Sequence, residues 1–263
     1  MRYFLPDDQS EALFARFDNV RFRIAEAAKT SDRSPADVTL IAVSKVHPPE
    51  ALATLACYWG QDGIPIFGEN YVQEALEKQH AVAALAPDIQ PAWHFIGHVQ
   101  SRKARDVVRR FLCVETVDSL KLARNLQKAW REMAAVRHIP RQAVLMQINI
   151  GREPQKSGVL PEDAARLALA VREMPELDMQ GIMCIPPLTV FEGKNADASR
   201  PYFAAMRELR DALARETGLL LKELSMGMSH DCEVAISEGA TMVRIGTDIF
   251  GPRPLRPSTD ASS

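Results

Sequence analysis

The chain repeats one pattern eight times: a short, almost continuous apolar segment, followed by a helical pattern or by a gap long enough for a helix. The apolar segments span residues 39–45, 64–67, 93–97, 111–116, 143–150, 179–185, 222–226 and 242–246. Strands that are apolar along their whole length and alternate with helices are typical of a parallel sheet covered on both faces. Eight such units in 263 residues most simply close into a single (β/α)8 TIM-type barrel. An open doubly wound sheet is the alternative, although no Gly-x-Gly-x-x-Gly sequence supports its dinucleotide-binding form.

An additional helix is predicted ahead of the first strand. The apolar residues Leu13, Phe17, Val20, Ile24 and Ala27 are spaced four or three apart, so they share one face of a helix. Further helical patterns cover residues 69–85, 119–137, 161–174 and 202–217. Residues 1–251 are therefore expected to form one barrel domain with an extra N-terminal helix.

Two segments rich in proline and polar residues are predicted to lack regular structure. Residues 252–263 contain three prolines and end in Ser-Thr-Asp-Ala-Ser-Ser, and we expect them to be a disordered tail. Residues 186–201 follow the sixth predicted strand, and we expect them to form a long polar loop that overhangs the mouth of the barrel.

The charges of the chain are nearly balanced, with 32 Lys and Arg against 34 Asp and Glu and a net charge of -2. This balance argues against a surface dedicated to nucleic acid or to an anionic membrane. No apolar stretch is long enough to span a bilayer, and the first ten residues lack the apolar core of a signal peptide. The four cysteines are far apart and form no Cys-x-x-Cys pair. We therefore expect a reduced, cytoplasmic protein.

Lys45 is the first candidate for chemistry, because barrel active sites lie where the strands end. Alternate strand residues point to the same side, so Lys45 shares a side with residues 39, 41 and 43 and is expected to project inward. Apolar surroundings lower the pKa of a lysine and leave its amine partly neutral, which is the form that attacks a carbonyl to give a Schiff base. The alternative is a lysine whose amine extends past the strand end into solvent.

The segments after the seventh and eighth strands suggest an anion site. Ser225-Met226-Gly227-Met228-Ser229 follows one strand and Gly246-Thr247 follows the other. Barrels frequently bind phosphate through the loops after these two strands. Glycine lets the backbone approach the ligand, while serine and threonine hydroxyls donate hydrogen bonds to phosphate oxygens. Ser229 also fits the N-cap of a helix that begins near His230, which is the alternative interpretation.

Arg244 has the same strand parity as Gly246, so it is expected to point into the barrel. A buried arginine stays charged and needs an acceptor. That acceptor is either a carboxylate in the core or a nitrogen of a ligand. A reactive lysine, an anion cradle and an interior arginine together match the three handles of pyridoxal 5'-phosphate: its aldehyde, its phosphate and its pyridine nitrogen.

The chain resembles the pyridoxal phosphate homeostasis proteins, single-domain barrels related to the N-terminal domain of alanine racemase. The resemblance runs from about residue 14 to residue 253, and six segments carry it in the order of the family: AVSK at 42–45, FGENYVQE at 67–74, WHFIG at 93–97, KSG at 156–158, SMGMS at 225–229 and VRIGT at 243–247. The resemblance implies that Lys45 carries the cofactor as a Schiff base and that Arg244 faces the pyridine nitrogen. It also implies that the phosphate is held by Ser225, Ser229, Gly246 and Thr247, with Met226 and Gly227 in the same turn and Asn70 near the cofactor ring.

The function implied by this resemblance is binding of pyridoxal phosphate for intracellular vitamin B6 homeostasis, without strong catalysis. An arginine at the pyridine nitrogen disfavours the protonated ring, which weakens the cofactor as an electron sink. The expected partners are the cofactor itself and transiently bound apo-enzymes that need it, and the expected state is a monomer. A low-activity amino-acid racemase is the first alternative. A Schiff-base lyase that acts on a phosphorylated sugar is the second.

Three further features, a histidine pair, a loop lysine and a basic segment, are weaker indications of a site. His94 and His98 have a spacing that suits a metal on a helix, but His94 lies on a predicted strand, so no metal site is predicted. Lys156 follows the fifth strand and is either a second amine near the mouth or a solvent-exposed loop lysine. Residues 101–110 contain five cations, and a solvated helix face is the preferred interpretation because the whole chain is slightly acidic.

Overall fold

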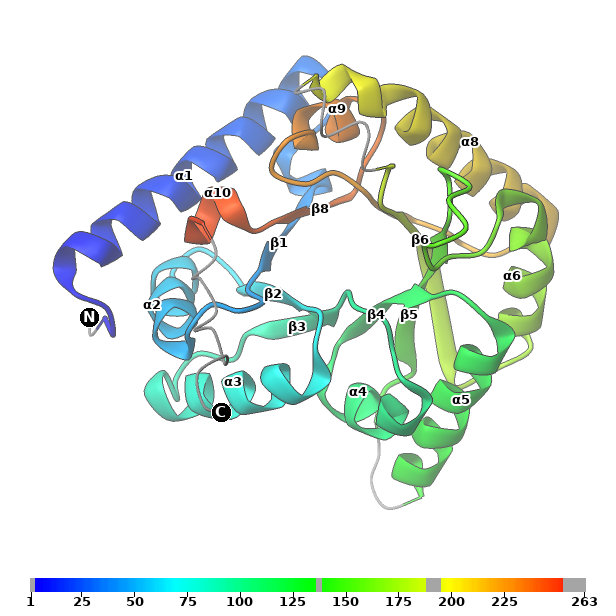
Figure 1. Ribbon diagram of the computed structural model, residues 1–263, viewed down its shortest axis with the longest axis horizontal. Coiled ribbons are helices and arrows are strands. Elements are labelled where there is room, and N and C mark those ends of the chain that lie inside the picture. The colour runs from blue at the N-terminus through cyan, green and yellow to red at the C-terminus, as the bar shows by residue number, and fades with distance from the viewer. Residues whose placement is uncertain (1–2, 136–138, 188–194, 253–263) are drawn as a thin grey trace, which may run out of the picture.

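The computed structural model describes residues 3–135, 139–187 and 195–252. Eight parallel strands close into a barrel in which each strand pairs with its neighbours in sequence and the last pairs with the first (Figure 1). The strands are β1 (Thr39–Val43), β2 (Ile66–Glu69), β3 (Ala92–Phe95), β4 (Cys113–Val117), β5 (Gln142–Ile148), β6 (Leu177–Cys184), β7 (Glu223–Ser225) and β8 (Met242–Ile245). The predicted (β/α)8 barrel is confirmed, and the doubly wound alternative is wrong.

Helices surround the barrel and connect one strand to the next (Figure 1). They are α2 (Pro49–Trp59), α3 (Val72–Leu85), α4 (Ala104–Arg110), α5 (Leu120–Ala134), α6 (Ala164–Arg172), α8 (Arg200–Thr217), α9 (Cys232–Ser237) and α10 (Thr247–Phe250). The helix predicted over residues 69–85 begins later, at Val72, because Glu69 still pairs with Phe95 in the sheet. The pattern at 161–174 starts as a 3-10 turn, η3 (Pro161–Asp163), before α6.

The predicted N-terminal helix is α1 (Asp7–Thr30), and the five apolar residues that predicted it are all buried. The helix lies across α9 and α10 and reaches α2, so it covers the outside of the barrel where the last strand meets the first (Figure 1). The apolar face of this long helix therefore packs over the junction of β8 and β1, since packing there removes the face from water.

Two separate apolar layers follow from the alternation of side chains along each strand. Even-numbered residues of β1, such as Leu40 and Ala42, belong to the large core between the sheet and the helices. Ile41 points the other way and belongs to a small core inside the barrel, together with Cys113, Ala143, Leu145, Met183 and Met242. Next to this inner core, toward the C-terminal ends of the strands, lies a layer of buried polar side chains. It is made by His94, Glu115, Ser225 and Arg244.

Part of the loop predicted over residues 186–201 is wrong. Residues Ala196–Ser199 form a 3-10 turn, η4, and α8 begins directly afterwards at Arg200. The side chain of Asn195 accepts a hydrogen bond from the amide of Asp197 (3.1 Å), which caps the turn. Residues 188–194 of that prediction, and all but residue 252 of the predicted tail, lie outside the described residues. No helix in the described part of the chain has the length and apolar character needed to cross a membrane.

Candidate functional site

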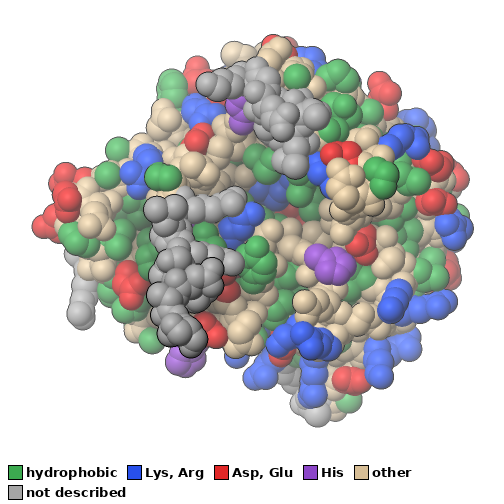
Figure 2. Space-filling view, viewed as in Figure 1, with side chains coloured by type: hydrophobic (Ala, Val, Ile, Leu, Met, Phe, Trp, Pro, Cys, Tyr) green, Lys and Arg blue, Asp and Glu red, His purple; other side chains and the backbone are tan. Residues whose placement is uncertain are grey.

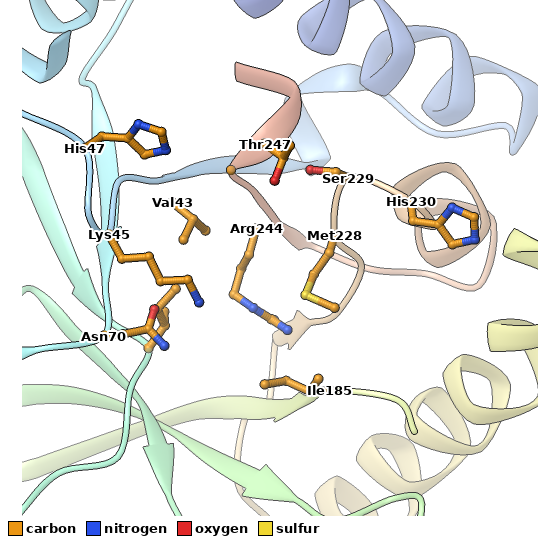
Figure 3. A pocket seen from close by; sticks show the side chains of 12 residues that line it. Val43, Lys45, His47, Asn70, Ile185, Met228, Ser229, His230, Arg244 and Thr247 are labelled. Atoms are coloured by element: carbon orange, nitrogen blue, oxygen red, sulfur yellow. The ribbon is translucent and has the colours of Figure 1, made fainter. Parts of the chain in front are cut away.

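A cavity of about 500 Å³ opens at the ends of the strands, where barrels carry their active sites. It is formed by the segments that follow β1, β2, β3, β6, β7 and β8 (Figure 3). Its lining residues are Val43, Lys45, His47, Asn70, Ile96, Ile185, Met228, Ser229, His230, Arg244, Gly246 and Thr247. Six of the nine predicted cofactor residues are in this set: Arg244 lies on β8, and the other five follow β1, β2, β7 and β8.

Lys45 lies two residues beyond the end of β1 and extends into the cavity, with its amine directed between Asn70 and Arg244 (Figure 3). The inward orientation predicted from strand parity is therefore confirmed, because Ile41 and Val43 point to the same side of the strand. The alternative, in which the amine leaves the barrel for solvent, is wrong for this structure.

Arg244 also points inward and is only 4% exposed. Its Nη1 donates to the hydroxyl of Ser225 (2.6 Å) and its Nη2 donates to the carbonyl of Cys184 (2.8 Å). The hydroxyl of Ser225 donates in turn to the carboxylate of Glu115 (2.6 Å). Arg244 thus lies one hydroxyl away from a carboxylate instead of forming a direct ion pair with an acid among the described residues. These hydrogen bonds hold the guanidinium in place at the edge of the cavity, which Arg244 lines.

Glu115, which the sequence analysis missed, completes this polar layer. It is fully buried on β4, and its second oxygen pairs with Nδ1 of His94 on β3 (2.7 Å). Burial by itself raises the pKa of the Glu115 carboxyl, but the hydrogen bond and charge of His94, the charge of Arg244 and the hydrogen bond from Ser225 lower it below its ordinary value. A charged residue at an interior position of a predicted buried strand was the signal that could have indicated it.

Ser229, Gly246 and Thr247 come together at one end of the cavity, where the hydroxyls of Ser229 and Thr247 lie side by side (Figure 3). A Cβ atom on Gly246 would lie 3.2 Å from the carbonyl oxygen of Val43, so a side chain there would crowd Val43. The alternative interpretation of Ser229 as an N-cap is wrong, because α9 begins at Cys232 and Asp231 precedes it.

The other three residues of the predicted phosphate turn do not line the cavity. Ser225 lies below it in the polar layer, where its hydroxyl is already engaged by Arg244 and Glu115. Met226 is buried in the core between the sheet and the helices. Gly227 has a φ of +93° and packs against α9 so closely that a Cβ would lie 2.5 Å from that of Ala235. These residues shape the turn that brings Ser229 to the cavity.

Arg23 of α1 holds the two loops of this anion site together. Its Nε pairs with Glu233 (2.6 Å), its Nη1 pairs with Asp248, and its Nη2 donates to the carbonyl of Ser229 (2.9 Å). The side chain therefore joins the loop after β7, the helix α9 and the first turn of α10. No sequence pattern indicates this role, since a single arginine on the polar side of an amphipathic helix is not distinctive.

The remaining lining residues were also missed, although all of them lie near predicted strand ends. His47 follows Lys45 closely and stacks on the ring of Phe250 with centroids 4.9 Å apart. Met228 belongs to the predicted turn, while Ile96, Ile185 and Val43 supply apolar walls. Such apolar residues cannot be told from core residues by sequence pattern alone.

The weaker sequence features lie outside this cavity. Lys156 pairs with Glu153 (2.6 Å) and donates to the carbonyl of Pro186 (2.9 Å), so it ties two neighbouring loops together and is not a lining residue. His94 is buried in the polar layer, whereas the side chain of His98 is 65% exposed. The two histidines therefore do not share a site.

The cations of residues 101–110 lie mainly on α4, and Lys and Arg side chains gather over α4 and α5 (Figure 2). Arg102, Arg105, Arg109 and Arg110 are all exposed, as expected for a solvated helix face.

An amine, a guanidinium and two hydroxyls converge on one cavity at the strand ends of a closed barrel. This combination is the one expected of the class of barrels that hold a small anionic ligand with a reactive carbonyl.

The comparison with known families agrees with that class. The family model for the alanine racemase N-terminal domain matches residues 16–254, and the chain belongs to this family. It is 39% identical over 238 residues to a pyridoxal phosphate homeostasis protein of Aquifex aeolicus, covering 90% of this chain and 97% of that protein. It is 43% identical over 234 residues to the one of Pseudomonas aeruginosa, covering 89% of this chain and 93% of that protein.

Solved structures show the same fold. The structure of PipY from Synechococcus elongatus with PLP bound is 35% identical and has a TM-score of 0.71, covering 87% of this chain and all of that one (100%). An alanine racemase of Clostridium difficile has a TM-score of 0.64 at 17% identity, covering 91% of this chain and 58% of that one. The second likeness concerns the fold alone.

Proposed function

We propose that this protein binds pyridoxal 5'-phosphate in the cavity at the strand ends and acts in intracellular pyridoxal phosphate and vitamin B6 homeostasis without strong catalysis. The observation that carries the proposal is the convergence of Lys45, Arg244 and the Ser229–Thr247 pair on one cavity. The relatives named for pyridoxal phosphate homeostasis support it, and so does the PipY structure with PLP bound.

The residues of the cavity fit this cofactor. The amide oxygen of Asn70 is buried without a hydrogen-bond partner among the described residues, so it is an acceptor available to a ligand. The hydroxyls of Ser229 and Thr247, with the backbone of Gly246 between the strand end and α10, suit the phosphate. When bound, the cofactor supplies an aldehyde, and the Lys45 amine condenses with it to form a carbon–nitrogen double bond as one water molecule leaves.

Arg244 would hold the pyridine nitrogen unprotonated, because its own charge opposes a second cation beside it. Its hydrogen bonds to Ser225 and Cys184 fix the guanidinium in that place. A protonated ring, usually maintained by a carboxylate, makes the cofactor a stronger electron sink for carbanion chemistry. A cofactor bound here is therefore stored in a form that is poorly suited to catalysis. A Schiff base is hydrolysable, so the cofactor can be released to apo-enzymes that require it.

The experiment that tests this proposal is the visible absorption spectrum of the purified protein with and without added pyridoxal phosphate. We expect a Schiff-base band in the wild type that is absent in Lys45→Ala and unchanged in Lys156→Ala. Lys156→Ala is the matched control, because this lysine lies in a loop at the same end of the barrel but does not line the cavity. Equal bands in all three proteins, or no band in the wild type, would contradict the proposal.

A further inference from the structure

A buried ionic cluster lies on the outer side of the sheet, directly behind the segment that carries Lys45. Its centre is Lys78 of α3, which is only 5% exposed. The amine of Lys78 donates to the carbonyl oxygen of Ser44 (2.6 Å), to Glu69 (2.9 Å) and to Glu74 (2.6 Å). None of the residues Glu69, Glu74 and Lys78 lines the cavity, so the cluster does not touch a ligand bound there.

Removing the charged groups of this cluster from water costs free energy, so we looked for what the cluster holds in place. Burying a charge pair loses hydration energy that its mutual attraction only partly restores. Glu69 is fully buried, and one of its oxygens has no hydrogen-bond partner among the described residues. Burial raises the pKa of the Glu69 carboxyl, although Lys78 and the hydroxyl of Ser44 oppose that rise. In other proteins, apolar side chains of similar volume in place of such a cluster are often neutral or stabilising.

What the cluster holds is the backbone on both sides of Lys45. On one side, Lys78 binds the carbonyl of Ser44, whose hydroxyl also donates to Glu69 (2.7 Å). On the other side, the amide of Val46 donates to the carboxylate of Glu74 (2.5 Å). Both anchors meet at Lys78, so Ser44 and Val46 are tied to one helix of the outer layer.

Val46 needs such an anchor, because its φ is +63°. A β-branched residue rarely adopts this left-handed conformation, and such a residue stays there only where its surroundings hold it. Without the anchor, Val46 would return to a negative φ and the preceding residue would turn with it. The amine of Lys45 would then no longer be directed into the cavity.

We propose that the Glu69–Glu74–Lys78 cluster is a positioning device that holds the strained turn after Lys45 and so aims the Lys45 amine at the cofactor aldehyde. This inference rests on the proposed binding of pyridoxal phosphate. The three residues act through Lys45, so they are positioning residues and not catalytic ones.

The test compares two ligands that differ only in the group that reacts with Lys45. Pyridoxal phosphate carries an aldehyde, whereas pyridoxine 5'-phosphate carries an alcohol in its place and binds without a covalent bond. Glu74→Ala removes the anchor of Val46, while Glu74→Gln keeps an oxygen that accepts from the same amide. Glu77→Gln is the matched control, because Glu77 is exposed on the same helix and contacts Gln73 instead.

In Glu74→Ala we expect the rate of Schiff-base formation to fall about tenfold, because a misdirected amine seldom reaches the aldehyde. The dissociation constant of pyridoxine 5'-phosphate should stay within about twofold, since Glu74 does not anchor the hydroxyls of Ser229 and Thr247 that hold the phosphate. Glu74→Gln should show a smaller loss of about threefold, and Glu77→Gln should match the wild type. If Glu74→Ala does not fold, the same comparison is made on Glu74→Gln.

Val46→Gly provides an independent check. Glycine adopts a positive φ without strain, so the loss caused by Glu74→Ala should shrink to about twofold or threefold when Val46 is already glycine. An unchanged Schiff-base rate in both Glu74 variants, or an equal loss for both ligands, would overturn the positioning role. Absence of any Lys45-dependent band in the wild type would instead overturn the proposed function, so the two failures are distinguishable.

Discussion

At the scale of single residues, the cavity depends on a chain of hydrogen bonds that runs across the barrel interior. Arg244 reaches Glu115 through the hydroxyl of Ser225, and Glu115 reaches His94. An arginine inside a barrel would be destabilising if its donors were unsatisfied. Within the part of the chain that the structure describes, Arg244 forms no direct ion pair; Ser225 and the carbonyl of Cys184 satisfy two of its donors while the residue still lines the cavity.

The acid sensitivity of the fold should depend on Glu115. Its pKa is lowered in the folded protein, so the folded state binds this proton less readily than the unfolded state does. Its stabilising contribution is therefore complete above the ordinary glutamate value of 4.5 and is lost as the pH falls below that value. In Glu115→Gln, we expect the free energy of unfolding at pH 7 to fall by about 3 kcal/mol, as when a buried pair is broken.

Urea unfolding between about pH 3 and pH 7 measures both effects, and the slope below the glutamate pKa should be shallower in Glu115→Gln than in the wild type. Parallel pH profiles for the two proteins would show that Glu115 does not titrate with a lowered pKa. Glu162→Gln is a suitable control, because that carboxylate lies in an exposed pair with Arg152 and such pairs contribute little to stability.

At the scale of elements, α1 has a role beyond covering the end of the barrel. Its apolar face is buried against the neighbouring helices, while Arg23 on the same helix joins the loop after β7 to α10. These two segments carry Ser229 and Thr247. The geometry of the anion site is therefore held by a helix that contributes no residue to the cavity lining.

Replacing Arg23 by Met should loosen the anion site more than it disturbs the barrel. We expect the dissociation constant of pyridoxine 5'-phosphate to rise about tenfold, because two hydroxyls that are no longer held together lose their preorganisation. Thermal unfolding should show a loss of about 2 kcal/mol, as expected when a partly buried, multiply bonded arginine is removed. Titration of the ligand by isothermal calorimetry checks the first effect.

Arg21→Met is the control on the same helix. Arg21 pairs with Asp62 at the surface, where the two side chains are 44% and 60% exposed, so its removal should cost less than about 1 kcal/mol and leave ligand affinity unchanged. Equal effects of the two substitutions would show that Arg23 stabilises the helix in general and not the anion site.

At the scale of the whole molecule, the barrel interior is divided into layers along its axis. An apolar layer that includes Ile41 and Leu145 fills the interior, the polar layer of Glu115 and Arg244 lies above it, and the cavity lies above both. Filled interiors are characteristic of eight-stranded barrels, so a ligand has room only beyond the strand ends. Inward-pointing residues at the strand ends place reactive groups in the cavity, while the helices cover the outer face of the sheet.

This arrangement predicts the outcome of a test for racemase activity. Among the described residues that line the cavity, the titratable side chains are Lys45, His47, His230 and Arg244, without a tyrosine or a carboxylate. Racemisation needs proton transfer on both faces of the substrate carbon, and an unprotonated pyridine ring stabilises the carbanion poorly. With alanine or serine in deuterated buffer, we expect no exchange at Cα above that caused by free pyridoxal phosphate, as measured by proton NMR. Exchange that disappears in Lys45→Ala would favour the low-activity racemase.

Much of the fold could be predicted from local patterns. Eight apolar segments, the helical spacing of Leu13, Phe17 and Val20, and the strand parity of Lys45 and Arg244 all concern neighbours in sequence, where side-chain direction follows from backbone geometry. The ends of elements were less certain. Ser229 has the chemistry of an N-cap, yet α9 begins at Cys232, because the turn after β7 is set by packing of Gly227 against that helix.

Local patterns and motifs were enough to predict the barrel, the inward direction of Lys45 and Arg244, and the family to which the chain belongs. The partners of the buried and partly buried cations became known only from the folded chain. They are Ser225 for Arg244, Glu69 and Glu74 for Lys78, and Glu233 of α9 and Asp248 of α10 for Arg23. These partners could not be predicted from the sequence, because burial and hydrogen bonding depend on distances between residues far apart in the chain. Periodicity indicates which side of its own element a residue faces. The partner comes from another element and contacts it only in the closed barrel.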